Sequence, residues 1–127
     1  MIAALSIRAL AGEPALVERF LALPALARAA GGPPRSLGGP TAGSPMGTAY
    51  DRSVLAAALA APDDARAFLA LDGDIAVARV LAFADGRLRE PDGRPIGCLG
   101  LFAAIDDPLT TRGLVGTALD WFASRPP

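Results

Sequence analysis

The stretch of sequence that decides the fold is residues 95 to 125, PIGCLGLFAAIDDPLTTRGLVGTALDWFASR. Residues 95 to 105 form an apolar run bounded by turn residues, which is typical of a β-strand. Asp107 followed by Pro108 is typical of a helix N-cap and of the first helical position. The stretch therefore predicts a strand that leads through a tight acidic turn directly into a helix.

The beginning of this helix is a candidate anion-binding site. Arg112, Gly113 and Gly116 lie in its predicted first turns. Backbone N–H groups at a helix N-terminus have no intrahelical partner, and the helix dipole places partial positive charge there. Small residues let a bulky anion approach the backbone, and an arginine adds a fixed positive charge. The pattern predicts phosphate binding; the alternative is that the glycines only permit close packing and that Arg112 is a solvated surface charge.

The strand at residues 95 to 105 is apolar on both of its faces. A strand that is covered on both sides lies inside a sheet, so we expect this strand to be central. The residues assigned to one face are Ile96, Cys98 and Phe102, and those assigned to the other are Leu99, Leu101 and Ile105.

The preceding sequence adds two more strands and three turns. Residues 66 to 71 and 74 to 84 are strand-like, and Asp-Gly pairs stand at 72–73, 85–86 and 92–93. Asp-Gly is a strong hairpin signal because both residues tolerate positive φ. The three strands are therefore expected to form an antiparallel meander, and the closing helix is expected to pack on it through one apolar stripe. That stripe consists of Val115, Ala118, Leu119 and Phe122.

The first 60 residues predict a strand, two helices and a long loop. Alternation of Leu5, Ile7 and Ala9 with polar residues indicates the strand. Pro14 opens the first helix, which Pro24 breaks or kinks. Residues 31 to 48 hold ten Gly or Pro in eighteen positions, which predicts a flexible loop, and residues 50 to 60 resume as a helix.

The amino-acid composition excludes several classes of protein and of catalytic site. The 127 residues suffice for one domain, 52% are hydrophobic and the net charge is -1, so neither disorder nor nucleic-acid binding is indicated. The sequence contains no Lys, His, Asn or Gln. Catalytic Ser/His pairs, imidazole metal ligands and a Walker A loop are therefore excluded. One cysteine, Cys98, makes neither an internal disulfide nor a cysteine zinc site, so no metal is expected.

No targeting or membrane segment is expected. Glu13, Glu18 and Arg19 interrupt the apolar N-terminal region, where a secretory signal would need an unbroken apolar run. No uncharged apolar run approaches the ~20 residues that cross a bilayer. A cytoplasmic location is the expectation.

The order of these elements resembles the front half of the GCN5-related N-acetyltransferase fold, most closely a bacterial branch of that family. The segments that carry the resemblance are DGRPIGCLGLFAAIDDP, TALDWFASR, and the opening SIRAL with LALP. The resemblance covers most of the chain outside residues 31 to 48. It implies an α/β (α+β) fold with a mixed, mainly antiparallel sheet and flanking helices, truncated after the closing helix.

The resemblance also implies acetyl transfer from acetyl-CoA to an amine. The pantetheine arm of the cofactor would lie beside Ala103 and Ile105, and its pyrophosphate would meet the amides around Arg112, Gly113 and Gly116. A main-chain amide of the strand would polarise the thioester carbonyl. The acceptor and the catalytic acid or base are not identified, although Glu90 or Asp92 is considered as a base.

Two other functions stay open. The chain is alternatively a non-catalytic CoA-binding or protein-interaction module, or an inactive fragment of an acetyltransferase. If no strand follows the closing helix, one edge of the strand at 95–105 is unpaired, and an unpaired edge attracts another chain. A homodimer or a partner chain that completes the sheet is therefore expected.

Overall fold

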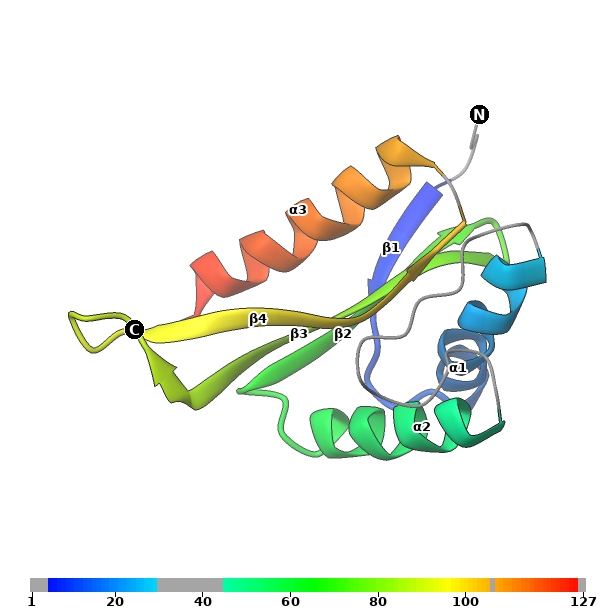
Figure 1. Cartoon of the computed structure of the whole chain (residues 1–127). Coiled ribbons are helices and arrows are strands. Elements are labelled where there is room, and N and C mark those ends of the chain that lie inside the picture. The colour runs from blue at the N-terminus through cyan, green and yellow to red at the C-terminus, as the bar shows by residue number, and fades with distance from the viewer. Residues whose placement is uncertain (1–4, 30–44, 106, 126–127) are drawn as a thin grey trace.

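A computed structural model describes residues 5–29, 45–105 and 107–125, and shows one antiparallel sheet between two layers of helices (Figure 1). The strands follow one another in the order β1-β2-β3-β4. Helix α3 covers one face of the sheet, and α1 and α2 cover the other (Figure 1). The elements are β1 (Leu5–Ala9), α1 (Pro14–Ala29), α2 (Pro45–Leu59), β2 (Ala65–Asp72), β3 (Ile75–Arg89), β4 (Pro95–Ala104) and α3 (Pro108–Ser124). None of the described helices is long and apolar enough to cross a membrane.

Each face of the sheet has its own hydrophobic core. On the α1/α2 side, Phe20, Leu23 and Leu55 pack against inward residues of β2 and β3. On the α3 side, Leu114 and Ala118 pack against the residues of β2 and β3 whose side chains point to the other face of the sheet. Because β2 and β3 are buried on both faces, they read as continuous apolar runs in the sequence.

Two helix boundaries differ from the sequence-based prediction. Helix α2 begins at Pro45, inside the segment predicted as a loop, since proline suits the first helical position. The rest of that loop prediction, up to residue 44, lies outside the described residues. Helix α1 continues through Pro24 to Ala29, so of the two predicted effects of this proline a break is wrong, and a kink stays a prediction.

The exposed side of α3 also differs from the prediction. Its buried residues are Thr110, Leu114 and Ala118, whereas Leu119, assigned to the apolar stripe, is 55% exposed. Asp107 is confirmed as the N-cap, with Pro108 at the first position of the helix.

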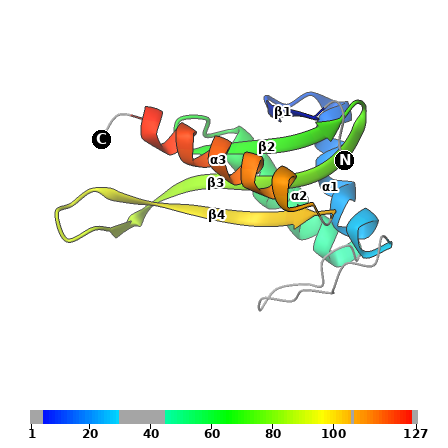
Figure 2. The ribbon, with the colours of Figure 1, turned by 90° about the horizontal axis from the view of Figure 1, so that it is seen from above.

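The hairpin between β3 and β4 is longer than the sequence indicates. The Asp85-Gly86 pair lies within β3, so its assignment to a turn was wrong. The chain reverses instead at residues 90–94, where Glu90 N donates to Arg94 O at 2.8 Å and Gly93 adopts a φ of 90°. The hairpin projects past the helices as a two-stranded arm (Figure 2). Asp85 pairs with Ile96 of β4. After a register shift, the pairing resumes at Arg89, which lies opposite Pro95.

Strand β4 is not central among the described elements. It pairs with β3 along one edge only, and Leu99 and Phe102 are 42% and 48% exposed. The prediction of a strand covered on both faces was therefore wrong for the described part of the chain. Helix α3 lies over β1, β2 and β3, which leaves the outer strand less covered (Figure 2).

Candidate functional site

A β-bulge interrupts the pairing of β4 with β3. Arg79 pairs with Ala103 and Leu81 with Gly100, so β4 carries one residue more than β3 between these pairs. Within the bulge, Leu101 adopts a φ of 50°, a conformation that is strained for a side-chain-bearing residue. Bulges re-aim backbone groups and are frequent next to active sites. Nothing in the sequence pattern signalled this feature.

The bulge decides which faces the β4 residues occupy. Leu101, within the bulge, and Ala103 pack on the α1/α2 core, whereas Ala104 and Ile105 pack on the α3 core. The alternation predicted for residues 95 to 105 placed Leu101 and Ile105 on one face, and that assignment was wrong. The inserted residue reverses the parity of Ala103 and Ala104, whereas Ile105 follows the end of β4, where the alternation of a strand no longer holds.

The two residues predicted to bind the cofactor arm, Ala103 in β4 and Ile105 just after it, have main-chain groups that point toward β3. The amide of Ile105 donates to Val77 O at 2.8 Å, which places its N–H toward β3. Ala103 lies two residues earlier and opposite Arg79. Because main-chain groups alternate between the two edges of a strand, the groups of Ala104 face the open edge. Ala104, next to both predicted residues, thus has main-chain groups that face an edge with which no described strand pairs.

The N-terminus of α3 is occupied by a carboxylate of the chain itself. Asp107 accepts hydrogen bonds from Leu109 N at 3.1 Å and from Thr110 Oγ1 at 2.9 Å. The hydrogen bond from Thr110, followed by backbone N–H groups, lowers the pKa of Asp107 below its ordinary value. An incoming diphosphate would meet this negative charge at the helix end.

The three predicted phosphate residues lie beyond the first turn of α3, whose N–H groups have no intrahelical partner. The helix begins at Pro108, so Gly113 and Gly116 lie in its second and third turns. A Cβ at Gly113 would lie 3.6 Å from Ile7 Cδ1, which makes close packing on β1 its visible role. A Cβ at Gly116 would meet nothing within 4 Å, and Arg112, four residues earlier on the same side of the helix, is exposed. Arg112 and Gly116 together therefore form an open surface of α3.

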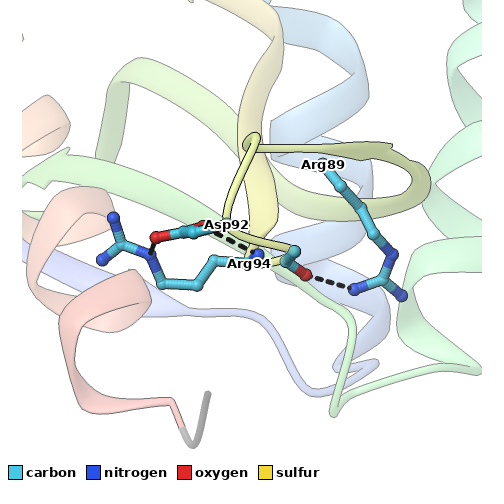
Figure 3. A network of polar contacts seen from close by, with 4 residues as sticks. Arg89, Asp92 and Arg94 are labelled. Atoms are coloured by element: carbon cyan, nitrogen blue, oxygen red, sulfur yellow. Dashed lines mark hydrogen bonds and ion pairs between the residues drawn. The ribbon is translucent and has the colours of Figure 1, made fainter.

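The two acidic residues considered as a general base lie in the tip of the projecting hairpin. Asp92 Oδ2 accepts from Arg94 Nε at 2.7 Å, and Asp92 Oδ1 accepts from Arg94 N at 3.1 Å (Figure 3). Arg89 Nη1 donates to Gly93 O at 2.9 Å. Glu90 is exposed in the same turn, where its N–H bonds to Arg94 O. These contacts stiffen the turn and bring neither carboxylate to the bulge.

A buried arginine of β3 forms an ion pair with α2 and a hydrogen bond with α1. The sequence analysis did not predict these contacts. Arg79 of β3 donates through Nη2 to Asp51 Oδ2 at 2.6 Å and through Nη1 to Phe20 O at 2.9 Å. The side chains of Arg79 and Asp51 are only 3% and 10% exposed. Burial lowers the pKa of Arg79, and the bond to Asp51 opposes that shift. A lone arginine in an apolar strand run was the signal that could have revealed the pair.

Pro24 explains why the carbonyl of Phe20 is free to accept this bond. In an α-helix the N–H of residue i bonds to the carbonyl of residue i−4, and proline has no N–H. Phe20 is four residues before Pro24, so its oxygen has no intrahelical donor, and Arg79 replaces that donor. The Phe20 ring also lies 4.8 Å from the guanidinium carbon. Arg79 thus supplies a donor to a carbonyl that Pro24 leaves without its usual helical partner.

No cluster able to hold a metal ion occurs among the residues that the structure describes. A hollow of about 370 Å³ lies where the end of β1, the end of α2 and the start of β2 meet. Its lining residues include none of the predicted cofactor residues, so it does not identify their ligand.

Comparison with known proteins supports the fold and leaves the activity open. No protein-family model matches the sequence, and no curated protein matches it. The structure is similar to that of a GCN5-related N-acetyltransferase from Ralstonia eutropha JMP134, with a TM-score of 0.59 and 18% sequence identity. The similarity covers 94% of this chain and 76% of that one. The chain therefore has a GCN5-related N-acetyltransferase-like fold, a mixed α+β architecture with an antiparallel sheet and flanking helices.

Proposed function

We propose that the chain binds acetyl-CoA along the open edge of β4 and transfers the acetyl group to an amine. The observation that carries this proposal is the bulge at Leu101, beside a strand edge with which none of the described strands pairs, in a fold of the acetyltransferase type. The pantetheine arm would lie beside residues 103 to 105, with the main-chain groups of Ala104 available to pair with it. The pyrophosphate would lie over the open surface formed by Arg112 and Gly116, near Gly113.

Acetyl transfer from a thioester to an amine requires mainly that the two reactants are held in a reactive geometry. The amine nitrogen attacks the thioester carbonyl carbon, a C–N bond forms, the C–S bond breaks, and the thiolate takes the proton that the amine loses. Holding the two reactants in one geometry supplies much of the acceleration, and a main-chain N–H aimed at the carbonyl oxygen stabilises the developing negative charge. A bulge that turns backbone groups toward the open edge suits this task.

Thermal unfolding with and without millimolar acetyl-CoA tests the proposal. A ligand at about 100 times its dissociation constant adds ~2.7 kcal/mol of stability. We expect the unfolding transition to rise with acetyl-CoA, and to rise less in Arg112→Ala. Arg52→Ala, which removes an exposed ion pair with Glu18, is the matched control and should keep the full ligand response. A cooperative transition that acetyl-CoA leaves unchanged would contradict the proposal.

A second candidate is a non-catalytic interaction module that pairs its β4 edge with a second copy or a partner chain. The exposed Leu99 and Phe102 beside that edge favour it, because β4 carries no charged residue that would discourage strand pairing. Light scattering tests this candidate. If acetyl-CoA and the second copy use the same edge of β4, we expect a dimer that dissociates when acetyl-CoA is added. A monodisperse monomer at all concentrations would rule out the homodimer.

A further inference from the structure

The side of α3 that faces away from the sheet exposes large apolar side chains. The side toward the sheet is marked by the buried residues Thr110, Leu114 and Ala118. On the opposite side, Leu109 and Leu119 are 74% and 55% exposed. Helix α3 is the outermost layer on its face of the sheet (Figures 1 and 2). Its outward side is therefore open to contact with another chain.

Gly116 lies at the middle of this outward side. A Cβ at Gly116 would meet nothing within 4 Å, so packing within the chain does not require a glycine there. Glycine is also a poor helix former, and it lets another backbone approach closely. The position therefore suits the point at which a second helix would cross α3.

Two opposite charges lie at equal distances on either side of Gly116. Arg112 is four residues before it and Asp120 four residues after it, which is about 6 Å in each direction along the helix. Both are exposed, and neither forms an ion pair or a hydrogen bond with any residue that the structure describes. This arrangement is self-complementary. When a second α3 lies antiparallel on the first, with a two-fold axis at Gly116, each Arg112 faces Asp120 of the partner subunit.

The same arrangement fits the sizes of the neighbouring side chains. Residues at equal distances from Gly116 in opposite directions face each other, so the exposed Leu109 lies opposite Ala123 of the partner subunit. Packed helices have interaxial distances of about 8–10 Å, which places the Cα atoms of Arg112 and Asp120 of the partner subunit about 5–7 Å apart. That separation is within reach of an ion pair between these two side chains.

We propose that α3 pairs antiparallel with α3 of a second copy of the chain, about a two-fold axis at Gly116, with Arg112 of each copy bound to Asp120 of the other. A contact of this kind is closed, so it gives a dimer and not a filament. Two helices of 17 residues bury less surface than a standard interface, and the dissociation constant is accordingly on the order of 10–100 μM. This surface is separate from the edge of β4.

Charge reversal followed by sedimentation equilibrium tests the proposal. Arg112→Asp and Asp120→Arg each bring like charges together at both ends of the contact, so each should weaken association at least about 10-fold. The double variant restores opposite charges and should return to within about 3-fold of the wild-type constant. Asp63→Arg, an exposed site outside α3, is the control and should associate like the wild type. Neither reversal in α3 opposes the helix dipole, and circular dichroism confirms that each variant is folded.

A second measurement tests the position of the two-fold axis. In a Cys98→Ala background, Gly116→Cys places the two thiols beside the axis, whereas Ala123→Cys places them about 21 Å apart along the helices. A disulfide needs Cα atoms about 4.4–6.8 Å apart, so only Gly116→Cys should give a cross-linked dimer on oxidation.

Three results would overturn the inference. The first is no association of the wild-type chain up to about 1 mM. The second is a double charge reversal that associates no better than the single variants, and the third is cross-linking through Ala123→Cys in place of Gly116→Cys.

Acetyl-CoA provides a further arm of the sedimentation experiment, and this arm rests on the proposed function. Because the pyrophosphate is proposed to lie over Arg112 and Gly116, acetyl-CoA should dissociate the α3 dimer. A dimer that binds acetyl-CoA without dissociating would refute that placement of the pyrophosphate and leave the α3 contact standing. A dimer that passes the charge-reversal test and binds no acetyl-CoA would refute the proposed function alone.

Discussion

Removing Asp51 should cost the fold far more than removing the whole ion pair. Asp51→Ala leaves the Arg79 guanidinium buried, 3% exposed, with only the Phe20 carbonyl as acceptor. Breaking a buried pair in this way typically costs about 3–5 kcal/mol. Against a total stability of about 5–15 kcal/mol, this loss is a large fraction. With a urea m-value of about 1–3 kcal/mol/M, the midpoint of unfolding should fall by at least about 1 M.

The double variant Arg79→Met, Asp51→Leu is the decisive comparison. Replacing a buried ion pair by apolar side chains of similar volume is often neutral or stabilising by about 1–4 kcal/mol. Here the gain is reduced because the double variant, which lacks Arg79, leaves the Phe20 carbonyl without this donor. We therefore expect the double variant to unfold near the wild-type midpoint and well above Asp51→Ala.

Urea unfolding followed by circular dichroism at pH 7 measures all three chains. Arg52→Ala serves as the control, because its partner Glu18 is exposed and such surface pairs contribute about 0–1 kcal/mol. If the double variant were as unstable as Asp51→Ala, or if Asp51→Ala lost no more than the control, the account of Arg79 as a buried charge held by Asp51 would be refuted.

Three further predictions concern other parts of the molecule. Gly97→Ala should destabilise by about 1–3 kcal/mol in chemical denaturation, because its Cβ would lie 2.7 Å from the partly buried Phe122 ring; an unchanged midpoint would contradict this placement. Gly116→Ala should stabilise α3 by up to about 1 kcal/mol, since nothing lies within 4 Å, and should weaken acetyl-CoA binding if the pyrophosphate uses this surface; unaltered calorimetric affinity would argue against that surface. Asp107→Asn should tighten acetyl-CoA binding by removing a negative charge from the end of α3 while keeping the cap, and weaker binding would show that the carboxylate helps the ligand. The pKa of Asp107 is lowered in the fold, so its stabilisation is present above its ordinary pKa of 3.8 and is lost as the pH falls further; Asp107→Asn should remove this contribution to acid unfolding, as monitored by fluorescence of Trp121.

Local features of the fold could be predicted from the sequence because their hydrogen bonds close within a few residues. Asp107 caps α3 through Leu109 and Thr110, two and three residues away. The turns at Gly73 and Gly93 need only a residue that tolerates positive φ. The order of strands and helices follows from the periodicity of apolar residues, which each segment carries by itself.

The site depends on contacts between distant segments, which no local pattern encodes. The bulge at Leu101 exists because β4 has one residue more than β3 between two paired positions, and only the register of both strands reveals it. Arg79 meets Asp51 across 28 residues and Phe20 across 59. The sequence by itself therefore determined the elements and their caps. Tertiary packing decided which strand edge no described strand pairs with, which residue faces that edge, and that Arg79 is buried against Asp51 and Phe20, because these properties arise only when separate elements pack against one another.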